Sequence, residues 1–125
     1  MTTERYKKGM EQMYKHIGPD ADKYLAKLKE ISPFFEQVNV EFPFGDLYSR
    51  PILDAKSREI AAISALTVMG YAKTGLAVHV EAALNCGMSK EEILEIIIQM
   101  IAYGGFPAAT EALRTAGEVF DKLGQ

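Results

Sequence analysis

The chain has 125 residues, of which 48% are apolar, and this supplies a core of ordinary size for one domain. Lys and Arg number 14 and Asp and Glu 17, so the formal net charge is −3 and the pI is near 5.4. A mildly acidic chain without a basic run is not expected to bind nucleic acid or an anionic membrane surface. Cys86 is the sole cysteine, which excludes an internal disulfide framework, and two histidines make a metal site improbable.

The N-terminal residues are polar and lack the apolar stretch of a signal peptide. The longest weakly polar run, residues 60–72, is shorter than the roughly 20 apolar residues that a membrane span needs. We therefore expect a soluble, cytoplasmic protein that forms a single domain over residues 1–125.

Helical periodicity dominates the first half of the chain. Residues 3–17 carry apolar side chains at three- and four-residue intervals, which predicts a helix with one apolar stripe that ends at Gly18-Pro19. A second helix is expected from residue 19 or 20 to residue 30. Ser32-Pro33 is a typical helix start, so a third segment begins there, and Pro43 to Asp46 is expected to break it. Pro51 keeps the next stretch irregular.

Four more helices are expected in the second half. Asp54 is a cap residue for a helix over residues 55–69, and a break at Gly70 separates it from a helix over 73–85. Ser89 and Glu92 have the spacing of a capping box, so the next helix starts there and is predicted to continue to Tyr103. Gly104-Gly105 ends it, and the last helix covers residues 107–123. No strand alternation of useful length interrupts this all-α pattern of about six to seven helices.

Two of these helices are apolar on every side. The segments 60–69 and 93–103 place Ile, Leu, Val and Met around the whole helix axis. Such a helix must be covered on all sides, and a domain of this length has limited capacity to enclose two of them. Burial against another subunit is therefore expected, and the alternative is a deep central helix pair within the monomer.

His79 and Glu59 are the candidate catalytic residues. A free imidazole titrates near pH 6.5, so His79 can exchange protons at working pH, although a core histidine bonded to a backbone carbonyl is the simpler alternative. Glu59 lies near the N-terminus of a predicted helix, where the helix dipole alone would favour its charge. Burial beside His79 would instead let Glu59 orient the imidazole.

The remaining candidates are weaker. Arg58 is by default a solvated charge, but it could pair bidentately with a substrate carboxylate. Cys86 lies at a helix C-terminal end, which lacks the groups that lower a thiol pKa, so it is expected to be a packing residue. His16, near the end of a charged helix, is expected at the surface. Gly104 to Pro107 can be an ordinary turn or can place Phe106 beside a pocket.

Four motifs resemble the carboxymuconolactone decarboxylase family. Residues 53–60 (LDAKSREI) and 79–87 (HVEAALNCG) are similar to its LDxKxRE(L/I) and HxxxALNxG motifs. Residues 89–95 (SKEEILE) and 99–109 (QMIAYGGFPAA) are similar to its (T/S)xEEIxE and QxxxYxGFPA motifs. These motifs cover residues 53–109 in the expected order. Residues 48–54 (YSRPILD) also fit the decarboxylase-like branch.

The resemblance implies an alkylhydroperoxidase-D-like all-α fold that assembles as a homo-oligomer, with a hexamer favoured and a trimer possible. It also implies a cofactor-independent acid–base lyase of aromatic catabolism that takes carbon dioxide from 4-carboxymuconolactone or a related small acid. His79 and Glu59 would be the proton-transfer pair, and Arg58, Tyr103 and Phe106 would bind or line the substrate. No metal or organic cofactor is expected.

Two other functions stay open at this point. The first is a non-catalytic oligomer on the same fold that binds a small molecule or is purely structural, which the sparse polar residues around His79 favour. The second is thiol-dependent peroxide reduction at Cys86. The redox branch of the resembled family uses a Cys-x-x-Cys pair before the histidine, and Tyr71 to Gly75 contain no cysteine, so we expect this chemistry least.

Overall fold

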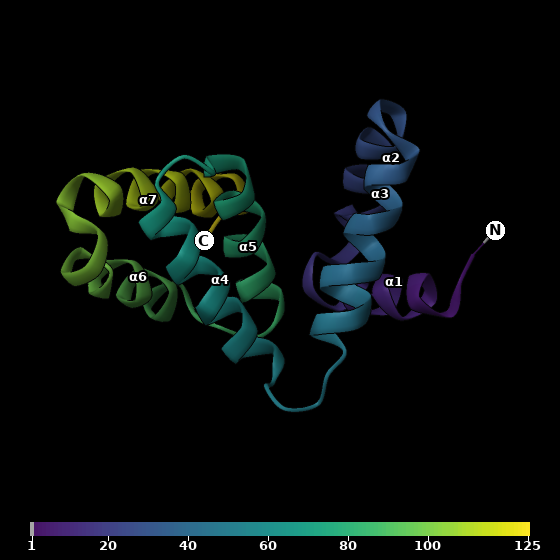
Figure 1. Ribbon diagram of the computed structural model, residues 1–125. Coiled ribbons are helices and arrows are strands. Elements are labelled where there is room, and N and C mark those ends of the chain that lie inside the picture. Colours follow the sequence, from purple (N-terminus) through teal and green to yellow (C-terminus); the bar gives the residue numbers. More distant parts are fainter. Residues whose placement is uncertain (1) are drawn as a thin grey trace. The chain divides into compact units, whose positions relative to one another are not determined.

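The computed structural model describes residues 2–125, and within that range all regular structure is helical (Figure 1). Residues 2–125 form seven α-helices, one 3₁₀ turn and one π-helical segment, which confirms the predicted all-α class. The chain divides into two compact units, and the boundary in the sequence lies between Ala55 and Lys56. The expectation of a single domain over the whole chain stays a prediction.

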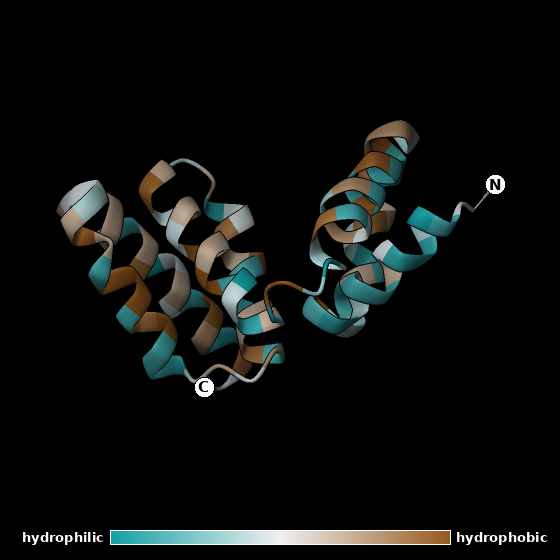
Figure 2. Ribbon diagram, turned by 60° about the horizontal axis from the view of Figure 1, so that its bottom comes forward, coloured by the Kyte–Doolittle hydropathy of each residue, from teal (hydrophilic) through white to brown (hydrophobic). Residues whose placement is uncertain are grey.

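The first unit contains α1 (Glu4–His16), the 3₁₀ turn η1 (Gly18–Asp20), α2 (Ala21–Ile31), α3 (Pro33–Asn39) and the π-helical η2 (Val40–Tyr48). Thr3 caps α1 by accepting a hydrogen bond from the Tyr6 amide, and Ser32 caps α3 in the same way. Figure 2 shows α1 as a largely hydrophilic helix. Its buried positions, Gly9, Met13 and His16, lie on one side, as a single stripe requires.

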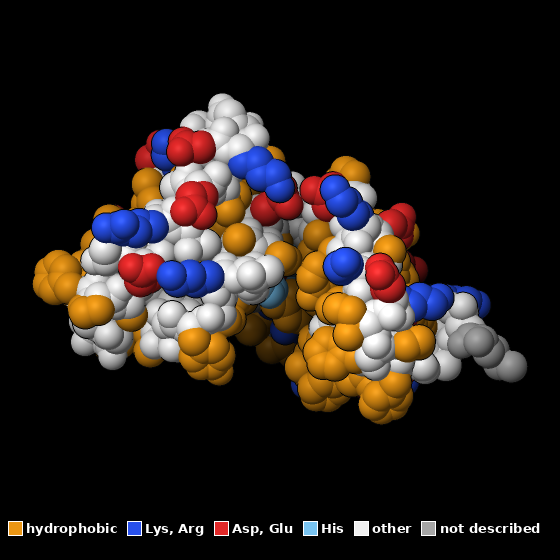
Figure 3. All heavy atoms as spheres, turned by 90° about the horizontal axis from the view of Figure 1, so that it is seen from above, with side chains coloured by type: hydrophobic (Ala, Val, Ile, Leu, Met, Phe, Trp, Pro, Cys, Tyr) orange, Lys and Arg blue, Asp and Glu red, His pale blue; other side chains and the backbone are white. Residues whose placement is uncertain are grey.

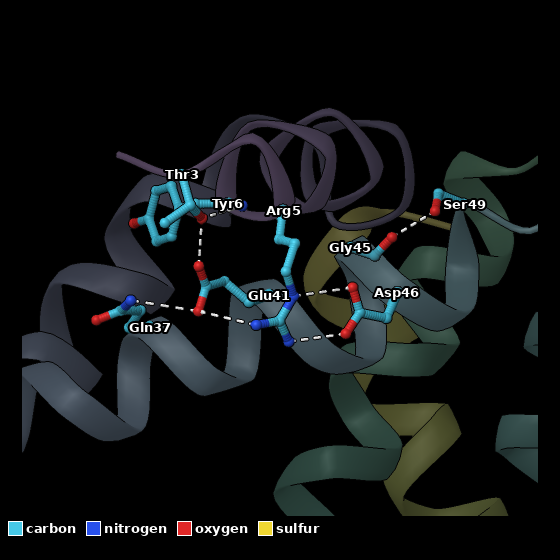
Figure 4. Close-up of polar contacts among 8 residues, drawn as sticks. All are labelled: Thr3, Arg5, Tyr6, Gln37, Glu41, Gly45, Asp46 and Ser49. Carbon is cyan, nitrogen blue, oxygen red and sulfur yellow. Dashed lines mark hydrogen bonds and ion pairs between the residues drawn. The ribbon is translucent and has the colours of Figure 1, made fainter. Parts of the chain in front are cut away.

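Helix α1 packs closely against η2. A Cβ atom on Gly9 would collide with the carbonyl oxygen of Val40, so only glycine allows the two backbones to approach this far. Polar contacts flank the crossing (Figure 4): the Arg5 guanidinium donates to both carboxylate oxygens of Asp46 at 3.1 and 2.7 Å, and Thr3 donates to Glu41. The first unit is therefore held by close backbone contact and by paired charges.

The expected break at Pro43 is wrong. The chain continues from α3 into η2 and remains helical to Tyr48, with Pro43 inside the π-helical segment. A proline in an α-helix lacks one hydrogen bond and clashes with the carbonyl four residues earlier. The wider π turn, which bonds residues five apart, accommodates the ring without ending the helix. The irregular stretch predicted around Pro51 is present between η2 and α4.

The second unit consists of α4 (Ala55–Met69), α5 (Lys73–Asn85), α6 (Lys90–Gln99) and α7 (Ile101–Leu123). The bounds of α4 and α5 match the prediction, and both hydrogen bonds of the Ser89–Glu92 capping box are formed. All four helices contribute to one buried apolar cluster. Its members are Ile63, Leu76, Val80, Ala83, Met88, Ile93, Ile97, Ala109, Ala112, Ala116 and Phe120.

The predicted continuation of the sixth helix to Tyr103 is also wrong. Helix α6 ends at Gln99, and residues 101–104 belong to the start of α7. The break expected at Gly104-Gly105 is confirmed: Gly105 adopts the non-helical angles φ 86° and ψ 168°, so α7 consists of two helical stretches that meet at a kink. This conformation is open to glycine and strained for other residues, so the glycine in the sequence permits the interruption at this position.

Large apolar side chains remain exposed in both units (Figure 3). In the second unit, the segments that read as apolar on every side leave Ile60, Val68, Met69 and Ile98 exposed. In the first unit, one apolar stripe runs from the end of α2 through α3 into η2, and it consists of Ile31, Phe34, Phe35, Val38 and Phe42. The expected oligomer stays a prediction. Between residues 2 and 125, no helix combines the length and apolar character of a membrane span.

Candidate functional site

Glu59 lies in the buried row of α4. The row repeats every four residues, with Glu59, Ile63 and Thr67 all pointing into the second unit. Ile63 belongs to the apolar cluster, whereas Glu59 brings a carboxylate to the same depth and is 0% exposed. A buried carboxylate is strongly disfavoured unless another group stabilises its charge.

His79 on α5 supplies such a group. Its Nδ1 lies 2.8 Å from Glu59 Oε1, which is hydrogen-bond distance, and the two residues come from neighbouring helices 20 positions apart in the sequence. The His79 side chain is 20% exposed, whereas that of Glu59 is fully buried. The imidazole therefore lies between a buried carboxylate and the outside of the unit.

This geometry defines how the imidazole can act. An ionised carboxylate accepts hydrogen bonds only, so Nδ1 carries the proton when Glu59 is charged. Nε2 is then the nitrogen that can accept a proton from a bound molecule, or return one after the ring becomes an imidazolium. The hydrogen bond to Glu59 fixes the orientation of the ring.

The hydrogen bond between Glu59 and His79 can be compared with the simpler interpretation of each residue, which is the helix dipole for Glu59 and a backbone carbonyl partner for His79. Glu59 lies just beyond the first turn of α4 and its side chain is buried, so the helix dipole does not explain the position of this carboxylate. His79 contacts a carboxylate, whereas the simpler alternative had it bonded to a backbone carbonyl. The structure thus brings together the two residues predicted to exchange protons, and their catalytic roles stay predictions.

The three residues predicted to bind or line the substrate are more exposed than Glu59. Arg58 precedes Glu59 on α4 and is partly buried. Tyr103 and Phe106 flank the Gly105 kink of α7 and are 71% and 70% exposed. Neither ring takes part in the hydrogen bond between Glu59 and His79. These three roles stay predictions.

Two further residues complete the comparison with the sequence. Cys86 is the C-cap residue of α5 and is partly exposed. His16 was expected at the surface, and this is wrong, since the residue is 1% exposed. Its ring lies 4.9 Å from that of Tyr48 and 6.4 Å from that of Phe44, both on η2. The helical continuation past Pro43, which the sequence did not predict, carries these rings.

One buried hydroxyl was not predicted from the sequence. Thr67 continues the row of Glu59 and Ile63, and its Oγ1 has no hydrogen-bond partner. Threonine is common in helices of mixed polarity, so the sequence does not indicate that this hydroxyl is buried, and only the packing of the helices shows it. Among residues 2–125, no three His, Cys, Asp or Glu side chains gather as the ligands of a metal ion would.

Comparison with known proteins gives a match to a family model and similarity to three relatives. The model of the carboxymuconolactone decarboxylase family matches residues 33–118. A 4-carboxymuconolactone decarboxylase of Acinetobacter baylyi is 32% identical over 122 residues, which are 97% of this chain and 90% of that protein. A nitrosuccinic acid decarboxylase of Metarhizium robertsii is 28% identical over 102 residues, covering 76% of this chain and 71% of the relative.

A third relative has no activity in its name. It is a 15.0 kDa protein of Paracoccus denitrificans from the nqo9–nqo10 intergenic region, 34% identical over 112 residues. The match covers 88% of this chain and 84% of that protein. Two of the three relatives are thus named as decarboxylases of small acids.

Proposed function

Because the chain belongs to the carboxymuconolactone decarboxylase family, we propose that it is a decarboxylase of a small organic acid and that it needs no metal or organic cofactor. The observation that carries the proposal is the hydrogen bond between buried Glu59 and partly exposed His79. The decarboxylase names of two relatives support the reaction class.

The chemistry asks for three things. The bond between the substrate carbon and its carboxylate breaks, carbon dioxide leaves, and the electron pair stays on the carbon. An electron-withdrawing group beside that carbon must take up the charge, and a proton must then reach the carbon. In this proposal His79 in its imidazolium form delivers the proton from Nε2, and solvent later restores it.

Glu59 acts through His79. Its carboxylate holds the ring by Nδ1 and stabilises the charged form that donates the proton, as an orienting carboxylate does beside other catalytic histidines. Arg58 is proposed to bind a substrate carboxylate, since a guanidinium can donate two parallel hydrogen bonds to it. Tyr103 and Phe106 are proposed to line the substrate.

We propose 4-carboxymuconolactone as the first substrate to test and nitrosuccinate as the second. Both are named in the relatives, and both are small acids with an electron-withdrawing lactone or nitro group. We also propose that the protein is a homo-oligomer, because apolar side chains remain exposed in each unit. A hexamer is favoured over a trimer by the family resemblance.

Replacement of either member of the pair tests the mechanism. His79→Gln should lower carbon dioxide release by about 10²- to 10⁴-fold, the usual contribution of a positioned acid or base. Glu59→Gln should lower kcat by at least about 10²-fold, because an amide does not stabilise the imidazolium. Glu81→Gln, two residues after His79 on α5, is the matched control and should leave turnover unchanged.

The outcomes separate the parts of the proposal. Circular dichroism must first show that each variant is folded. Unchanged turnover in folded His79→Gln would refute the role of the pair. If the unmodified protein releases no carbon dioxide from either acid, the proposed substrates are wrong, and a non-catalytic binding protein is then the better interpretation.

A further inference from the structure

The hydroxyl of Thr67 lies in the second unit, outside the pair formed by Glu59 and His79. Thr67 is 1% exposed, and its Oγ1 has no hydrogen-bond partner among the protein atoms. Buried hydroxyls are nearly always hydrogen-bonded, because a group that loses water without replacement destabilises the fold. The partner of this hydroxyl is therefore to be sought outside the chain.

A small cavity adjoins this residue. It is lined by Thr67 on α4, by Ala72 and Lys73 at the start of α5, and by Glu111 and Thr115 on α7. The space open to the centre of a water molecule is about 10 Å³. This is about the smallest volume that holds one water and is too small for an organic ligand.

The first turn of α5 brings further polar groups to this cavity. Its N-cap residue, Ala72, has no side chain that could accept a hydrogen bond from the turn. The amides of a helix start need acceptors, and a water oxygen is one. Thr115 donates its hydroxyl proton to the Glu111 carbonyl at 3.0 Å, so its oxygen retains acceptor capacity.

The charges beside the cavity favour a neutral occupant over an ion. Lys73 Nζ and Glu111 Oε2 form an ion pair at 2.7 Å, so the cation and the anion that line the cavity compensate each other. A buried water typically makes about three hydrogen bonds, and Thr67, Thr115 and the first turn of α5 offer that number.

We propose that one ordered water molecule binds in this cavity and joins Thr67 Oγ1 to the first turn of α5. It is a structural ligand that links the C-terminal end of α4 to the N-terminal end of α5. Thr67 lies eight residues after Glu59, about 12 Å along the same helix, so the water acts at the far end of the helix pair that carries Glu59 and His79. The proposal stands independently of any catalytic activity.

Crystal structures of the unmodified protein and of Thr67→Ser and Thr67→Val test the proposal. The unmodified protein and Thr67→Ser, which keeps the hydroxyl, should show a water oxygen within about 2.6–3.2 Å of residue 67 Oγ. Thr67→Val has the same shape without the hydroxyl and should lose that water. In solution, oxygen-17 relaxation dispersion should count one long-lived water fewer in Thr67→Val.

Three results would overturn the inference. The first is Oγ1 bonded to the Ile63 carbonyl beside an empty cavity in the unmodified protein. The second is a water that persists unchanged in Thr67→Val, and the third is an ion at the site. The structures of the unmodified protein and of Thr67→Ser decide the question even if Thr67→Val does not fold.

Discussion

Three glutamates are buried among residues 2–125, and their partners differ in kind. Glu36 accepts a hydrogen bond from the Tyr6 phenol, and Glu41 accepts hydrogen bonds from Thr3 and Gln37. These donors are neutral and keep their protons near neutral pH, and the Arg5 guanidinium, which also pairs with Glu41 at 4.0 Å, keeps its charge there. Glu59 differs because its partner is an imidazole, which can gain and lose a proton in that range. Burial alone therefore does not distinguish Glu59 from the other two carboxylates, and the chemistry of its neighbour does.

The Tyr6–Glu36 contact predicts an alkaline loss of stability. Burial and the hydrogen bond to Glu36 raise the pKa of Tyr6 from 10.0 to about 12. Because the folded-state pKa is the higher one, the stabilising contribution is complete below pH 10 and is lost as the pH rises through about 12. Urea unfolding should therefore show a steeper alkaline loss in the unmodified protein than in Tyr6→Phe.

Tyr71→Phe is the control for this measurement. Tyr71 is exposed in the turn between α4 and α5, so its removal should leave the alkaline loss as steep as in the unmodified protein. Equal steepness in Tyr6→Phe and the unmodified protein would contradict the assignment to Tyr6.

At the scale of the elements, local signals placed some helix ends correctly and missed others. The start of α6 was predictable because the capping box satisfies its first amides within four residues. The bounds of α4 and α5 follow from the break at Gly70. Gly104-Gly105 correctly marked an interruption, because Gly105 leaves the helical region and divides α7 at a kink. Pro43 was misleading, because a π-helical turn accommodates it without ending the helix.

The close crossing of α1 and η2 at Gly9 can be tested by comparing Gly9→Ala with the same substitution at Gly117, which has no close neighbour. Gly9→Ala should lower the free energy of unfolding by about 1–3 kcal/mol, because the new methyl group collides with the Val40 carbonyl. Gly117→Ala should raise it by about 0.5–1 kcal/mol, because Gly117 lies inside α7 with no atom within 4 Å of the added Cβ.

Chemical denaturation of the two variants measures both effects. Because each change adds one methyl group inside a helix, helix propensity favours both, and only the neighbouring atoms differ. A Gly9→Ala protein as stable as the unmodified one would show that α1 and η2 do not pack this closely.

At the scale of the whole molecule, exposed apolar surface is the feature to explain. The apolar stripe of the first unit follows one side of α3 and continues into η2, and the second unit exposes further apolar side chains on α4 and α6. Contiguous apolar surface of this kind is typical of protein–protein contact. It supports the proposed homo-oligomer, whose subunit mass is 13.8 kDa.

Charges in the apolar stripe should weaken that assembly. The double variant Phe34→Glu, Val38→Glu puts two carboxylates where apolar contact is proposed, so sedimentation velocity should detect a smaller species than for the unmodified protein. Lys29→Glu, which changes an exposed charge on the side of α2 away from Ile31, should keep the original mass. An unmodified protein that sediments at 13.8 kDa at every concentration would contradict the proposed oligomer.

The sequence by itself determined the helical class and most of the helix starts, and it singled out Glu59 and His79 as candidates for proton transfer. Such signals act over a few neighbouring residues, through caps, periodicity and the chemistry of single side chains. The tertiary structure decided that Glu59 meets His79 across 20 positions, that His16 is covered by aromatic rings, and that Thr67 is buried without a partner. These contacts depend on which helix faces pack together, and residues distant along the chain settle that jointly.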